Sequence, residues 1–125
     1  MARILCVDDE PLARSLKLAI LERAGHEVVL SHSSEDAILR LNRETFDAIV
    51  TDWKIGTQDG RSLLEAAKGG AGVPVVVVSG YVAEALRGYE PFADIYLEKP
   101  VDPDELLQIL DALLRDRLGS GGNES

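Results

Sequence analysis

The sequence predicts a doubly wound α/β domain, in which helices cover both faces of a parallel sheet. Short apolar runs alternate with amphipathic segments along the chain, and the connections between them are short. The run at residues 73–78 is almost entirely valine, which is typical of a central parallel strand buried on both faces. Together these observations indicate five strands that alternate with five helices.

The first half of the chain accounts for three strands and two helices. We expect strands at residues 3–7, 26–30 and 46–51. A helix over residues 10–24 should bury the stripe of Leu12, Leu16, Ala19, Ile20 and Arg23, and Gly25 should end it. Ser33 or Ser34 should cap a second helix that buries Ala37, Ile38 and Leu41.

The second half predicts the remaining elements. A short helix over residues 59–68 should precede the valine strand, and a short helix over 82–88 should precede a strand at 94–98. Asp102 should cap a last helix over residues 103–118, with Pro103 near its first position and a stripe of leucines facing the core. The Gly/Ser-rich residues 119–125 should form a flexible tail after a single domain over residues 1–118.

Composition excludes several function classes. The 125 residues, 46% of them hydrophobic, are enough for one domain with its own core. A formal net charge of −9 argues against direct binding of nucleic acid or of an anionic membrane surface. The single cysteine, Cys6, lies in an apolar run and reads as a buried hydrophobe. Because no signal peptide or membrane-length apolar segment is present, we expect a cytoplasmic protein.

Polar residues follow the predicted strands at the same relative position. Asp8 and Asp9 follow the first strand, Asp52 the third, Ser79 the fourth and Lys99 the fifth. In a doubly wound sheet these positions share the edge where ligands bind. Each pair of carboxylates there costs about 4 kcal/mol at about 4 Å and an effective dielectric constant of about 20, which a Mg²⁺ ion would offset. The edge therefore predicts a site for a divalent cation and a phosphoryl group.

Each of these residues also has a structural interpretation. Asp8 and Asp9 could cap the first helix, Asp52 could be a turn residue, and Lys99 could be an ordinary solvated lysine. Their joint occurrence at four strand ends favours the functional interpretation.

The motifs at these strand ends resemble the receiver domain of bacterial two-component response regulators. They are Asp8-Asp9, the segment from Asp52 to Gly60, Ser79-Gly80 and Tyr96-Leu97-Glu98-Lys99-Pro100. The resemblance covers residues 3–118. It implies a flavodoxin-like sheet with the strand order 2-1-3-4-5 and five flanking helices.

The resemblance also implies a role for each site residue. Asp52 would be the phosphoacceptor and a Mg²⁺ ligand, Asp9 a direct ligand, Asp8 a ligand through water, and the backbone carbonyl of Lys54 a further ligand. Lys99 would neutralise the phosphoryl group.

Further family features concern the conformational switch. Ser79 would bond the phosphoryl group and act with Tyr96 as a switch that alters the face made by the fourth helix, fifth strand and fifth helix. Pro100 would follow a cis peptide bond.

The implied function is a phosphorylation-dependent switch rather than an enzyme. A histidine kinase, or a histidine phosphotransfer protein of a phosphorelay, would donate the phosphoryl group. The output would be contact with a downstream protein target, as a monomer or as a homodimer formed on phosphorylation. The sequence leaves open whether the chain acts alone or comes from a hybrid kinase or longer regulator.

Lys54 and Gly56 depart from the family pattern, since many relatives carry a neutral or acidic residue at the first position and proline at the second. Lys54 keeps open a degenerate receiver that acts as a constitutive protein-interaction module. An aspartyl-phosphate phosphohydrolase would need an acid at position 54. A flavodoxin-like mononucleotide binder would need a Ser/Thr/Gly-rich loop where Asp8-Asp9-Glu10-Pro11 stands.

Overall fold

The computed structural model describes residues 2–55, 58–59, 61–69, 72–79 and 95–123, which form a five-stranded parallel sheet with helices on both faces. The strand order is β2-β1-β3-β6-β7, and every neighbouring pair is parallel. The strands are β1 (Arg3–Val7), β2 (Glu27–Ser31), β3 (Ala48–Asp52), β6 (Val75–Ser79) and β7 (Ile95–Glu98). The predicted doubly wound fold and its strand order are confirmed.

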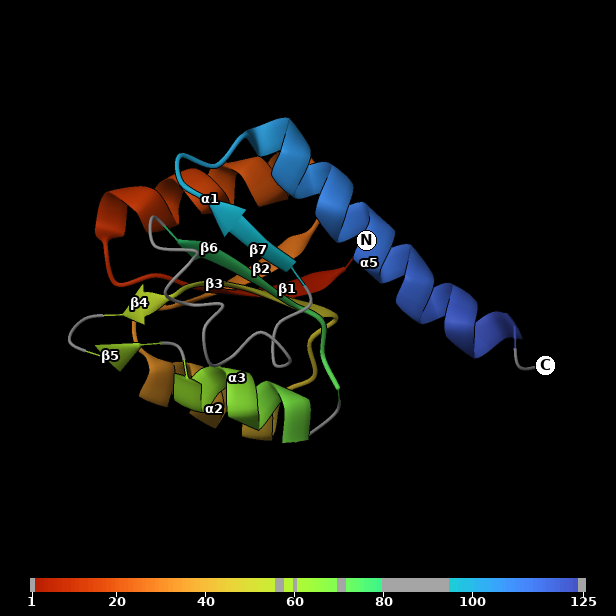
Figure 1. The fold of residues 1–125 in the computed structure, drawn as a ribbon, viewed down its shortest axis with the longest axis horizontal. Coiled ribbons are helices and arrows are strands. Elements are labelled where there is room, and N and C mark those ends of the chain that lie inside the picture. The colour runs from red at the N-terminus through yellow and green to blue at the C-terminus, as the bar shows by residue number, and fades with distance from the viewer. Residues whose placement is uncertain (1, 56–57, 60, 70–71, 80–94, 124–125) are drawn as a thin grey trace.

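Within the residues that the structure describes, two helices pack on each face of the sheet (Figure 1). Helices α1 (Pro11–Arg23) and α5 (Pro103–Asn123) cover one face, and α2 (Ser34–Arg43) and α3 (Arg61–Gly69) cover the other. The helix predicted over residues 82–88 lies outside the described residues. In the described part of the chain, no helix is both long and apolar enough to cross a membrane.

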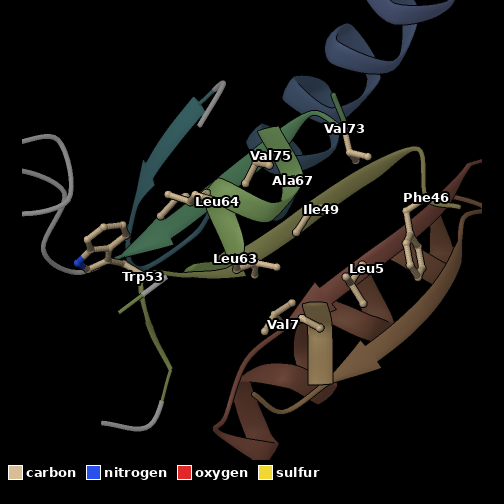
Figure 2. Close-up of a cluster of buried hydrophobic side chains, with 12 residues drawn as sticks. Leu5, Val7, Phe46, Ile49, Trp53, Leu63, Leu64, Ala67, Val73 and Val75 are labelled. Carbon is tan, nitrogen blue, oxygen red and sulfur yellow. The ribbon is translucent and has the colours of Figure 1, made fainter. Parts of the chain in front are cut away.

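Strand periodicity divides the buried side chains between two cores. Along β1, Ile4 and Cys6 point toward α1 and α5, whereas Leu5 and Val7 point toward α2 and α3. All five residues of β3 are buried, as expected of a central parallel strand. Figure 2 shows the second core, with Trp53 at the carboxyl end of the sheet near Leu64 of α3.

The buried face of α1 differs from the predicted one. Leu12 and Leu16 are 76% and 59% exposed, while Lys17, Ile20 and Leu21 are buried. Apolar residues occur around most of this helix, so periodicity alone did not select the face that meets the sheet. The helix is rotated so that Lys17 faces the strand ends.

The helix termini follow local chemistry. Ser33 Oγ accepts a hydrogen bond from the Asp36 N–H at 3.0 Å, and Asp102 Oδ1 accepts one from the Asp104 N–H at 3.0 Å. Helix α5 does not end at Leu118 as predicted but continues to Asn123 and projects beyond the sheet (Figure 1). Each residue added to a helix gains a backbone hydrogen bond, and no proline stops it there.

A short hairpin after β3 was not predicted. Strands β4 (Lys54–Ile55) and β5 (Gln58–Asp59) pair antiparallel, and α3 begins at Arg61 instead of residue 59. Strands of two residues carry too little periodicity to be recognised in a sequence. The pairing places β4 and β5 directly after the carboxyl end of β3.

Candidate functional site

The sheet register brings the ends of β1 and β3 together. Val7 pairs with Thr51, so Asp8 and Asp52 follow paired residues on neighbouring strands. Asp8 is fully buried and Asp52 is 8% exposed, whereas Asp9 is exposed. The predicted carboxylates therefore reach the same edge of the sheet but differ in their access to solvent.

Asp52 forms an ion pair with Lys99. Lys99 Nζ lies 2.7 Å from Asp52 Oδ2, and the two side chains are 38% and 11% exposed. Thr51 Oγ1 donates to the Asp52 carbonyl oxygen at 3.0 Å, which further fixes the backbone at the strand end. The sequence predicted both residues for this edge, and the structure brings their charged groups into direct contact.

The negative charges around Lys99 raise the pKa of its ammonium group. Burial acts to lower this pKa, but the hydrogen bond with Asp52 and the negative charges of Asp52, Asp8 and Glu10 outweigh it, so the pKa is raised. Lys99 therefore remains a cation, and it lies in the field of carboxylates from two strand ends.

A second ion pair joins Asp8 to Lys17. Lys17 Nζ lies 2.8 Å from Asp8 Oδ2, and the Lys17 side chain is only 4% exposed. The other oxygen, Asp8 Oδ1, accepts a hydrogen bond from the Glu10 N–H at 3.0 Å. Arg14 Nη1 adds a bond of 2.9 Å to the Asp8 carbonyl oxygen. Asp8 is thus held at both carboxylate oxygens and at its backbone.

Lys17 was not among the residues predicted for the site. Its spacing from Ile20 and Leu21 does place it on their face of α1, but this signal was hidden by the competing stripe of Leu12 and Leu16. The ammonium groups of Lys17 and Lys99 offset part of the repulsion between Asp8 and Asp52, because each pairs with one of these carboxylates. A divalent cation is therefore not needed to explain why these carboxylates lie together.

The donor chemistry of the edge nevertheless fits Mg²⁺. Among the described residues, no group of three His, Cys, Asp or Glu side chains is arranged to hold a metal ion. Mg²⁺ commonly uses only one or two protein carboxylates, with water and phosphate oxygens completing the octahedron. Asp9 and Asp52 can supply such oxygens, since Asp9 is exposed and Asp52 retains some exposure.

The remaining predicted residues surround this edge. β6 ends at Ser79, which pairs with Glu98, the residue before Lys99. Only the backbone of Ser79 and of Lys54 is described, and Lys54 lies in β4, two residues past Asp52. Tyr96 is half-buried and packs against the core on the α2 and α3 side. The Lys99–Pro100 peptide bond is cis.

Comparison with known proteins identifies a single family. The model of the response regulator receiver domain matches residues 4–111. A curated relative, the transcriptional regulatory protein GlrR of Escherichia coli, is 33% identical over an alignment 116 residues long, and the alignment covers 90% of this chain. The chain spans 26% of the length of that relative. It spans 15% of the gliding motility regulatory protein of Myxococcus xanthus and 52% of the phosphate regulon regulatory protein PhoB of Klebsiella pneumoniae.

Solved structures agree with the sequence comparison. The CheY-like receiver domain protein from Methanospirillum hungatei has a TM-score of 0.87 and 28% identity, with 96% of this chain and 98% of that chain covered. The receiver domain of sensor histidine kinase PA1611 from Pseudomonas aeruginosa has a TM-score of 0.77 and 27% identity, with coverage of 90% and 97%. The latter structure contains a magnesium ion in its active-site cleft.

Proposed function

This chain belongs to the response regulator receiver family, and we propose that it is a signalling switch in which Asp52 accepts a phosphoryl group. The observation that carries the proposal is the Asp52 carboxylate at the end of β3, with the Lys99 ammonium 2.7 Å away. A nucleophile and a cation for the transferred group are thus already adjacent. We place this exchange in the cytoplasm.

The transfer needs little covalent chemistry from the protein. An Asp52 carboxylate oxygen attacks phosphorus, and the bond from phosphorus to the donor imidazole nitrogen breaks with its electron pair going to that nitrogen. Because the other ring nitrogen of the phosphorylated imidazole carries a proton, the histidine side chain of the kinase or phosphotransfer protein leaves in its neutral form. Lys99 moves its hydrogen bond from Asp52 to an oxygen of the phosphoryl group, where it offsets negative charge. Ser79 donates its hydroxyl to another oxygen of that group.

The site would also hold Mg²⁺ through Asp9, Asp52 and the backbone carbonyl of Lys54, with Asp8 contributing through water. When bound, this ion supplies positive charge to the phosphoryl oxygens. The residues of the chain bind and orient the ion. Support comes from the oxygen donors at the edge and from the magnesium ion in the related receiver domain.

The output is a change of protein contact rather than catalysis of a substrate's conversion. Phosphorylation draws Ser79 toward the modified Asp52 and turns Tyr96, which now packs on the core beside β6, toward the interior. This alters the surface around β7 and α5, to which a downstream protein target binds. The chain itself acts as a monomer or as a dimer formed on phosphorylation, and it makes no direct contact with nucleic acid.

Trp53 provides a direct test, because it is buried next to Asp52. We expect its fluorescence to change on titration with Mg²⁺ and to change further with a beryllofluoride mimic of the phosphoryl group. The matched control is Asp52→Asn, which should abolish the beryllofluoride response. A wild-type protein that responds to neither reagent would support a degenerate receiver acting as a constitutive interaction module.

A further inference from the structure

Lys17 is a buried lysine on the face of α1 that packs against the sheet. It is 3% exposed, and its neighbours on that face, Ile20 and Leu21, belong to the hydrophobic core. Burying an ammonium group is costly unless a negative charge lies close to it. The Asp8 carboxylate, at 2.8 Å and fully buried, supplies that charge.

Burial distinguishes this pair from the pair of Asp52 with Lys99. The side chains of Lys17 and Asp8 are 4% and 0% exposed, whereas that of Lys99 is 38% exposed, and each oxygen of Asp8 already accepts a hydrogen bond. The contact is shielded from water, so salt and solvent weaken it little. Any cation that uses Asp8 must compete with Lys17 for the same carboxylate.

We infer that Lys17 is a positioning residue that weakens Mg²⁺ binding by holding and neutralising Asp8. The inference rests on the proposed function, because it concerns the cation that accompanies phosphorylation of Asp52. The ion is then bound mainly by Asp9, Asp52 and the backbone carbonyl of Lys54. A weaker site gives the cellular Mg²⁺ concentration control over how readily the protein accepts a phosphoryl group.

The test is the dissociation constant for Mg²⁺ in wild-type protein and in Lys17→Met. Methionine keeps an unbranched side chain, one atom shorter than that of lysine, but removes its charge, so the negative charge of Asp8 near the metal site is no longer matched. We expect a dissociation constant about tenfold lower in the variant. The dissociation constant can be measured by Trp53 fluorescence. An independent measure is the increase, with Mg²⁺ concentration, in the urea concentration at which half of the protein is unfolded.

Two further variants separate the role of the pair from that of net charge. Lys17→Arg retains the charge and should keep the wild-type dissociation constant. Arg14→Met removes an equal charge that donates to the Asp8 carbonyl oxygen rather than to the carboxylate, and it should change the constant much less. Equal tightening by Arg14→Met and Lys17→Met would overturn the inference, because overall charge would then explain the effect.

Stability separates a structural role from control of the metal. If Lys17 serves the fold alone, Lys17→Met lowers the free energy of unfolding without Mg²⁺ and leaves the dissociation constant unchanged, which overturns the inference. If the variant folds only when Mg²⁺ is added, the cation has replaced Lys17 at Asp8, and this result supports the inference about Lys17. A variant that stays unfolded at saturating Mg²⁺ contradicts it.

The same titration distinguishes this inference from the proposed function. When wild-type protein binds Mg²⁺ and forms an acyl phosphate on Asp52, an unchanged constant in Lys17→Met overturns only the role of Lys17. When neither protein binds Mg²⁺, the inference and the Mg²⁺ site of the proposed function fail together.

Discussion

Lys99 Nζ lies 2.7 Å from Asp52 Oδ2, and the two residues are 47 positions apart in the sequence. Asp52 is the last residue of β3 and Lys99 directly follows β7, and β6 lies between these two strands in the sheet. The ion pair therefore crosses the carboxyl end of β6, the strand that lies between β3 and β7. This arrangement places a cation where negative charge would develop during phosphorylation of Asp52.

Replacement of Lys99 should affect phosphorylation far more than stability. In Lys99→Met we expect the rate of phosphorylation by acetyl phosphate to fall by about 10²- to 10³-fold, because the charge on the transferred group loses its partner. The free energy of unfolding should change by about 1 kcal/mol or less, because Lys99 is partly exposed.

The control is Lys68→Met, which removes an exposed lysine at the end of α3 and should leave the phosphorylation rate unchanged. If Lys99→Met accepted phosphoryl groups at the wild-type rate, Lys99 would have no part in the transfer.

Lys54 should influence how long the phosphoryl group persists. An ammonium two residues past Asp52 can pair with the phosphoryl group, so Lys54→Ala should change the rate of dephosphorylation severalfold. The rate is measured by loss of the acyl phosphate from purified phosphoprotein. An unchanged rate would show that Lys54 does not affect the lifetime of the phosphoryl group. Lys68→Ala serves as the matched control.

The thiol of Cys6 should react only when the protein unfolds. Cys6 is fully buried in β1, and this burial raises the pKa of the thiol to about 11. We expect alkylation in mildly alkaline buffer to follow the urea dependence of global unfolding. Modification of native protein at a rate independent of urea would show that β1 opens locally, contrary to its central place in the sheet.

Asp36 should make the stability depend on pH in the acid range. Ser31 Oγ donates to Asp36 Oδ2 at 2.8 Å and Arg40 Nε donates at 3.0 Å, and these bonds lower the pKa of Asp36 below its ordinary value of 3.8. The unfolded chain therefore binds the proton first as pH falls. The stabilisation is present above pH 3.8 and is lost as pH falls through the lower pKa of the folded state.

Carboxyl NMR titration of Asp36 measures this pKa directly. In Ser31→Ala the largest cause of the shift is removed, so the pKa should move toward 3.8. A wild-type pKa at or above 3.8 would show that these hydrogen bonds do not form in solution.

The sheet was predictable because its signals are local and mutually consistent. The valines of β6 and the apolar residues of β1 and β3 could only be buried strands, and the polar residues after them were placed at one edge by the parallel topology alone. The strand order that the family resemblance implied places Asp52 and Lys99 at this same edge, on either side of β6. These elements needed no information from side-chain packing.

Other features depend on packing, which the sequence does not display. The rotation of α1 is set by how its side chains fit the sheet, so the exposure of Leu12 and Leu16 and the burial of Lys17 could not be read from periodicity. The short β4 and β5 hairpin and the extension of α5 to Asn123 depend on backbone hydrogen bonds rather than on a hydrophobic pattern.

The central claim is that Asp52 is the residue that becomes phosphorylated. The most direct measurement is intact-protein mass spectrometry after incubation with Mg²⁺ and acetyl phosphate, in wild-type protein and in Asp52→Asn. We predict that wild-type protein gains the mass of one phosphoryl group and that Asp52→Asn gains none. An unmodified wild-type protein, or the same mass gain in Asp52→Asn, would contradict the account.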